Sequence, residues 1–268
     1  MKLDYGKSIS RAFRFGFSPK RWLPLFLLNL TLAILIISFI MIFIPLFGNI
    51  SGTQPDSVLT LSLLSILGPL VLIALFWWLI AMWIIGAIIN QTYKEDEYMK
   101  SWKLSLNRYL CLLAAMILVA IITGLAGAIP YVGWVFSIVF GLMFFFVMQG
   151  VMITKLGPVD ALKNSYKIFR KDTLDVFLIW LISIVITLVI VAIFAIPAMI
   201  FFVGLLITFI SPTIPQAGLF SALLDSSQPG LLVLIVSGIL VVIGMSISQA
   251  FSFKLQTEFY LQLRKKKL

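Results

Sequence analysis

The sequence predicts an all-α integral membrane protein with about six transmembrane helices arranged as three hairpins. Hydrophobic residues make up 62% of the 268-residue chain, and charged residues only 11%. A soluble domain is roughly 45–50% apolar and about a quarter charged, and a domain of this length still exposes much of its surface. Most of the surface of this protein is therefore expected to face lipid.

Six apolar stretches are each long enough to cross about 30 Å of hydrocarbon at about 1.5 Å per residue. They are expected at residues 22–47, 58–90, 109–129, 131–153, 174–210 and 230–253. Backbone amides in lipid must be hydrogen-bonded within their own segment, and the alternating pattern of a barrel strand is absent, so each stretch is expected to be helical. The chain is predicted to form a single polytopic domain without a soluble domain on either side.

Two of the stretches are too long for one straight crossing, and both contain proline. Pro69 follows Gly68 in the second stretch, and Pro197 lies in the fifth. Because proline removes a helical hydrogen bond, each span either is tilted and bent, extends beyond the membrane interface, or is broken to line a binding site, as in transporters. If spans two and five were broken, they would frame a cavity, and its candidate lining residues are Ser62, Ser65, Pro69, Thr187 and Pro197.

The basic residues segregate between the connections in a way that predicts topology. All twenty Lys and Arg residues precede the first span, follow the sixth, or lie between spans two and three or four and five. The connections at 48–57, around Pro130 and at 211–229 contain none. The positive-inside rule therefore places both termini in the cytoplasm. A nucleic-acid partner is not expected, because the bases lie in short connections beside apolar runs.

A four-residue pattern of small, aromatic, basic and apolar residues recurs shortly before each odd-numbered span. Its copies are Ala12-Phe13-Arg14-Phe15, Ser101-Trp102-Lys103-Leu104 and Ser165-Tyr166-Lys167-Ile168. Apolar residues recur at helical spacing around each copy, and flanking bases can extend their long stems to phosphate groups. The sequence thus predicts three short amphipathic helices on the cytoplasmic surface, one before each hairpin. The residues predicted to contact the lipid surface or a partner are Phe13, Arg14, Trp102, Lys103, Tyr166 and Lys167. The alternative is that any segment beside a membrane collects aromatics and bases.

Two segments carry a resemblance to a known group. They are Gly-Ala-Ile-Pro-Tyr-Val-Gly-Trp at 127–134 and Gly-Pro-Val-Asp-Ala-Leu-Lys-Asn-Ser-Tyr-Lys-Ile-Phe-Arg at 157–170. Over roughly residues 124–185 the chain resembles a broad group of bacterial and archaeal multi-pass proteins. The group includes uncharacterised six-helix families and the membrane domain attached to some glycerophosphoryl diester phosphodiesterases. The resemblance implies the plasma membrane of a prokaryote. Because no phosphodiesterase domain is present here, it implies neither hydrolase chemistry nor catalytic residues.

Catalytic, cofactor-binding and metal-binding residues are not expected. The chain has no His, which is the commonest general base and metal ligand, and its single Cys, Cys111, is interpreted as an apolar filler. The acidic run 95–97 is interpreted as a solvated cap, since three consecutive residues do not converge on one point. Glu258 is expected beyond the last span. Neutral polar residues within the spans, such as Asn29, Ser183 and Gln249, are expected to bond between helices.

The leading functional hypothesis is a non-enzymatic membrane protein. It would be a structural, regulatory or assembly partner whose short helices contact the anionic lipid of the inner leaflet, with a second membrane protein as a further candidate partner. The alternative is a transporter or flippase of a neutral or amphiphilic solute. A deep carboxylate, which proton- or sodium-coupled carriers usually need, is absent. A lipid-modifying enzyme would need a carboxylate pair, a metal set or a histidine.

Overall fold

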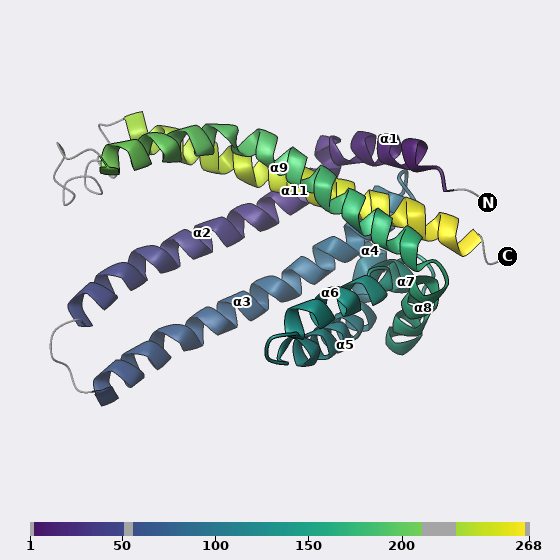
Figure 1. Cartoon of the computed structure of the whole chain (residues 1–268), viewed down its shortest axis with the longest axis horizontal. Helices are drawn as coiled ribbons and strands as arrows, with labels where there is room; N and C mark the ends of the chain where they lie inside the picture. Colours follow the sequence, from purple (N-terminus) through teal and green to yellow (C-terminus); the bar gives the residue numbers. More distant parts are fainter. Residues whose placement is uncertain (1–2, 51–55, 211–228, 266–268) are drawn as a thin grey trace.

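The computed structural model describes residues 3–50, 56–210 and 229–265, and every regular element in these residues is an α-helix (Figure 1). Side chains are not described at residues 40, 42–50, 56–67, 204–210 and 229–231. Within the described residues, six helical segments are long and apolar enough to cross a membrane. They are α2 (Pro19–Ile50), α3 (Asp56–Tyr93), α5 (Tyr109–Gly127), α6 (Gly133–Met143) with α7 (Val147–Met152), α9 (Thr173–Ile210) and α11 (Pro229–Lys265). The predicted fold class is confirmed.

A short helix precedes each of the three hairpins. These helices are α1 (Tyr5–Gly16), α4 (Tyr98–Asn107) and α8 (Pro158–Lys171). All three lie at the end of the bundle where the described chain begins and ends (Figure 1). We refer to α1, α4 and α8 together as the collar. The predicted order of a short helix followed by a two-helix hairpin, three times over, is confirmed.

The break in the helical spans occurs in span four and not at the two prolines. Helices α3 and α9 continue through Pro69 and Pro197. In span four, α6 ends at Met143 and α7 begins at Val147. The collar residue Ser165 donates its hydroxyl to the Met143 carbonyl (2.7 Å), and its Oγ accepts the Phe146 amide (3.2 Å). An interruption within a membrane-spanning segment is tolerated here because the Ser165 side chain of α8 forms hydrogen bonds with backbone groups that lipid would leave unpaired.

Helix α11 lies at the centre of the bundle end that carries the collar. It contacts α1, α2, α3, α7 and α9. The sequence predicted a span ending at residue 253, but the helix runs to Lys265, and Leu255, Phe259 and Leu263 are at most 1% exposed. These residues recur every four positions and form a buried stripe on one face. Lys254 and Glu258, whose charges suggested that the span ends near residue 253, occupy other positions of the same helical turns.

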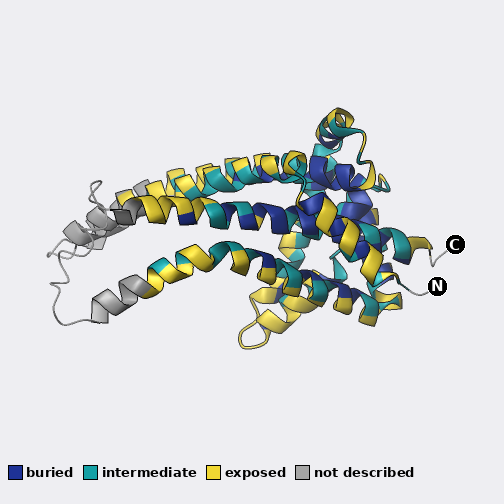
Figure 2. Cartoon of the chain, turned by 90° about the horizontal axis from the view of Figure 1, so that it is seen from above, coloured by how far each residue is buried: buried dark blue, intermediate teal, exposed yellow. Residues whose placement is uncertain are grey.

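Burial is concentrated at the collar end. Figure 2 shows the buried residues gathered where the termini lie, whereas exposed residues dominate farther along the spans. One group of buried residues is centred on α11 and includes Phe251 and Tyr260, each 0% exposed. A second group joins α3, α5, α7 and α8 around Leu112 and Val151. The side chains that the structure brings together from distant parts of the sequence are therefore mainly those near the collar.

Candidate functional site

Helix α1 packs against α11 through a row of small residues. Ser8, Ala12 and Gly16 are spaced four apart and are all buried. A Cβ added at Gly16 would lie 3.0 Å from Phe251 Cβ, which shows how closely the two helices approach. Gln262 Nε2 on α11 also donates to Ser8 Oγ over 2.7 Å. Small residues at this spacing allow helix backbones to come close together.

Helix α4 packs on α3 in a similar way. Ser101 Oγ accepts a hydrogen bond from Asn90 Nδ2 (3.0 Å), and Ser105 Oγ donates one to the Trp83 carbonyl (2.6 Å). Both serines are 0% exposed. Gly86 leaves the room that Ser105 needs, because a Cβ at Gly86 would lie only 2.5 Å from the serine oxygen.

Helix α8 completes the set. Its first turn contains Pro158, and proline is well tolerated at this end of a helix. Its last turn contains Arg170 and Lys171, whose positive charges interact favourably with the negative end of the helix dipole. Ala161, which is 0% exposed, faces α7, where a Cβ added at Gly150 would lie 3.3 Å from the alanine Cβ. Four residues later, Ser165 makes the hydrogen bonds at the break in span four.

The small residue of the recurring pattern is therefore the packing residue. Ala12, Ser101 and Ser165 are at most 1% exposed. The pattern alone suggested no role for this position, although small residues recur four apart along α1, α4 and α8. The three bases, Arg14, Lys103 and Lys167, are all exposed.

The three aromatic residues of the pattern are not equivalent. Phe13 lies against Phe251 of α11 (ring centroids 4.8 Å apart), and Trp102 packs edge-on against Trp83 of α3 (5.3 Å). Tyr166 is 41% exposed. The sequence predicted contact with the lipid surface or a partner for all three rings, but the rings of Phe13 and Trp102 also pack against spanning helices.

A buried cation holds the end of α11 to its neighbours. The Lys254 side chain is only 6% exposed, and its Nζ donates to the Thr92 carbonyl (2.7 Å) and lies 2.7 Å from Glu95 Oε1 and 3.0 Å from Glu258 Oε1. Glu258 also pairs with Arg11 of α1 over 3.2 Å. The interpretation of the 95–97 run as a solvated cap missed this ion pair of Glu95, whose side chain is 39% exposed. The turn after α3 folds back over α11, which brings this carboxylate to a lysine far away in sequence.

Arg21 is a second base with internal partners. Its guanidinium donates to Gln91 Oε1 (3.1 Å) and to the Glu95 carbonyl. The same group lies 5.2 Å from the centre of the Phe15 ring and 6.0 Å from that of Tyr98. Like Lys254, Arg21 connects helices, so these two of the twenty bases serve the packing of the collar end.

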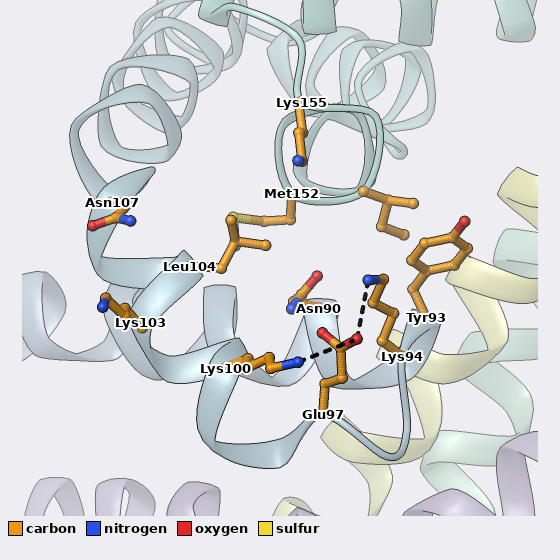
Figure 3. A pocket seen from close by; sticks show the side chains of 11 residues that line it. Asn90, Tyr93, Lys94, Glu97, Lys100, Lys103, Leu104, Asn107, Met152 and Lys155 are labelled. Carbon is orange, nitrogen blue, oxygen red and sulfur yellow. Dashed lines mark hydrogen bonds and ion pairs between the residues drawn. The ribbon is translucent and has the colours of Figure 1, made fainter.

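A cavity of about 330 Å³ lies between the end of α3, the collar helix α4 and the end of α7. Its wall contains four lysines, namely Lys94, Lys100, Lys103 and Lys155. Lys94 and Lys100 converge on Glu97, with Nζ atoms 3.2 Å and 4.0 Å from Glu97 Oε1. Figure 3 shows Lys155 extending into the cavity from the end of α7, across from this group. We call this cavity the lysine pocket.

The residues predicted to line one cavity between spans two and five are not brought together. Pro69 lines an apolar cavity of about 530 Å³ between α2 and α3. Thr187 lines a different cavity, of about 620 Å³, with Ser252 and Gln256 of α11. Pro197 is exposed on α9, and the side chains of Ser62 and Ser65 lie outside the described residues. The helix that packs along α9 is α11, which explains the separation.

Some of the neutral polar residues of the spans bond between helices, as predicted, whereas Thr31 and Thr123 bond to the backbone of their own helices. Asn29 Nδ2 on α2 donates to Ser246 Oγ (3.0 Å) and Gln249 Oε1 (3.1 Å) on α11. Ser183 on α9 pairs with Ser252 on α11 over 2.9 Å. These contacts attach neighbouring spans to α11.

No protein-family model matches this chain, and neither does any curated protein or solved structure. Its function therefore has to be inferred from its own side chains.

Proposed function

We propose that this multi-pass protein is a non-enzymatic structural, regulatory or assembly partner whose collar binds the anionic inner leaflet of a prokaryotic plasma membrane. The single observation that supports this is the spacing within the collar. In each collar helix a buried small residue is followed two positions later by an exposed base: Ala12 and Arg14, Ser101 and Lys103, Ser165 and Lys167. Two positions correspond to about 200° around a helix, so the residue that packs on the bundle directs Arg14 and Lys167 away from it, while Lys103 lies at the edge of the lysine pocket.

Bases directed away from a bundle at a membrane surface are suited to lipid phosphates. A base near an anionic leaflet contributes about 1 kcal/mol of binding free energy. The positive-inside rule and the clustering of the collar with both described chain ends support a cytoplasmic position for the collar. If these bases served only to set the topology, they could lie anywhere in each cytoplasmic connection. They would not need to lie at one fixed distance from the packing residue.

The transporter alternative has less support. It depends on a cavity framed by spans two and five, whereas Pro69 and Thr187 line separate cavities in the part of the chain that the structure describes. The absence of histidine from the sequence favours the non-enzymatic proposal, since histidine is the commonest general base.

The test is to change Arg14, Lys103 and Lys167 together to Gln, which leaves seventeen of the twenty bases to hold the topology. The variant should insert correctly but retain less phosphatidylglycerol when it is purified from membranes that contain this lipid. A matched control changes Lys7, Lys163 and Lys171 to Gln. These three are also exposed bases of α1 and α8 but lie outside the recurring pattern. Equal lipid retention by the motif variant and the wild type, at low and high salt, would refute the proposal.

A further inference from the structure

We propose that the lysine pocket is a binding site for one phosphate-bearing group. This deepens the proposed function and rests on it, since it specifies where a lipid phosphate would be held. Four lysines line the pocket, and Glu97 is its single acidic residue among those that the structure describes. The lining therefore carries three more positive than negative charges around a space of about 330 Å³. Like charges gathered in this way favour a bound anion.

Among the described residues, part of the positive charge of the pocket is not paired with a carboxylate. Glu97 is placed to neutralise part of the charge of Lys94 and Lys100, which lie 3.2 Å and 4.0 Å away. Among the described residues, no carboxylate lies within ion-pair distance of Lys155 or Lys103. Lys155 extends toward the group around Glu97, and Lys103 lies at the edge beside Asn107 (Figure 3). An anion entering between Lys155 and Lys100 would meet ammonium groups from two different elements.

The backbone at Lys155 explains how its side chain reaches the pocket. Lys155 follows the end of α7 and has a φ of 57°, in the left-handed region that often ends a helix. Here the conformation directs a long basic side chain from the end of α7 back into the pocket (Figure 3).

The position of the pocket favours a lipid as the source of the phosphate. Tyr93 and Met152 both line it, and they are the last residues of two of the membrane-spanning segments. The pocket thus lies where apolar spans end, at the level expected for headgroups. Leu104 and Ile153 add apolar surface beside the lysines. Its volume is near the lower limit of ligand sites, about 300 Å³, which suits a phosphorylated headgroup and not a folded peptide.

The test uses the full-length protein and two substitutions, Lys100→Gln and Lys155→Asn. Asparagine tolerates a positive φ better than most residues, so the second change removes the charge without adding backbone strain. The matched control, Lys163→Gln with Lys171→Gln, makes the same change in charge at exposed positions outside the pocket. Each protein is placed in phosphatidylcholine nanodiscs doped with phosphatidylglycerol, and tightly retained phosphatidylglycerol is measured by native mass spectrometry. We expect at least about tenfold weaker retention by the pocket variant and no change in the control.

A second arm identifies the source of the phosphate. Inorganic phosphate is titrated into the detergent-solubilised wild type and pocket variant, and binding is followed by calorimetry. Binding that is lost in the pocket variant would support the site and identify a free anion as a sufficient ligand. If the pocket variant and the control behave alike toward both phosphatidylglycerol and inorganic phosphate, the proposal is overturned.

A third variant separates this proposal from the proposed function. Arg14→Gln with Lys167→Gln removes two bases of the recurring pattern but leaves all four pocket lysines in place. If this variant loses bulk anionic lipid while the pocket variant retains its lipid and phosphate like the control, the pocket proposal fails and the collar proposal stands. If only the pocket variant loses its ligand, the pocket proposal stands, and the recurring bases Arg14 and Lys167 are not the lipid contacts of the collar.

Discussion

Lys254 Nζ on α11 lies 2.7 Å from Glu95 Oε1, in the turn between α3 and α4, although 158 positions separate the two residues in the sequence. The lysine side chain is 6% exposed, so its charge is largely removed from water. Burial of a charge is tolerated when partners and hydrogen bonds replace the lost hydration. Glu95, Glu258 and the Thr92 carbonyl provide that replacement. The pair ties the last helix to the segment that leads into the second hairpin.

Replacing Lys254 with Met should strongly destabilise the protein. The substitution preserves much of the side-chain volume but removes the ammonium group that Glu95 and the Thr92 carbonyl share, and it leaves Glu258, which is 13% exposed, with Arg11 as its remaining cation. Removing one member of a buried ion pair costs about 3 kcal/mol or more in the free energy of unfolding. Thermal and denaturant unfolding in detergent would measure the loss.

Lys94→Met is the matched control for this change. Lys94 also pairs with a glutamate, Glu97, but its side chain is 52% exposed. An exposed pair contributes about 1 kcal/mol or less, so this variant should remain close to the wild type. Equal destabilisation by the two substitutions would contradict a special role for Lys254.

Replacing Gly86 with Ala should loosen the attachment of α4 to α3. The added Cβ would lie 2.5 Å from Ser105 Oγ, which the Trp83 carbonyl holds in place. Overpacking of this kind costs about 1–3 kcal/mol. Adding Ser105→Ala should recover part of the loss, because it removes the clashing oxygen.

Gly141→Ala provides the comparison for the glycine variant. Gly141 is also helical, but apart from its own helix backbone and chain neighbours no atom lies within 4 Å of a Cβ added there. This substitution should be neutral or slightly stabilising, because alanine favours the helix over glycine. If it were as harmful as Gly86→Ala, close packing at Gly86 would not be the cause.

Replacing Tyr260 with Phe should weaken the connection between α11 and α8. The Tyr260 hydroxyl, on a residue that is 0% exposed, accepts a hydrogen bond from Asn164 Nδ2 over 3.0 Å and lies 3.0 Å from Thr154 Oγ1. Loss of the hydroxyl leaves the asparagine donor without this partner and should cost about 1–2 kcal/mol. Tyr131→Phe, at a residue that is 97% exposed, should have no measurable effect on unfolding.

The topology can be tested with reporters fused or inserted along the chain. Reporters at residue 1, in 91–108, in 154–172 and at 268 should all report the cytoplasm, because every basic residue lies in or beside these segments or the terminal ones. A reporter in 211–229 should report the opposite side. A cytoplasmic result for that loop would exclude an arrangement with six spans.

The spans and the collar helices could be predicted from sequence because each depends on local physics. A long apolar run in lipid has to satisfy its own backbone groups, so residues 109–129 indicate a helix whatever surrounds them, and the structure has α5 there. Likewise, the spacing of apolar residues around Trp102 indicates a short helix, and α4 is present. The bases at 14, 103 and 167 were identified as surface residues for the same local reason.

The partners of each helix were decided only by the tertiary structure. Lys254 looks in the sequence like one more base of a charged tail, and Glu95 like part of a solvated loop. Their pairing depends on α11 continuing to Lys265 at the centre of the collar end. The lysine pocket likewise combines residues from the end of α3, from α4 and from the end of α7. Hydropathy and charge along a chain report the solvent each segment prefers, but they carry no information about which segments meet. That is determined by packing between helices, such as that of Ser105 against Gly86, and by polar bonds to α11.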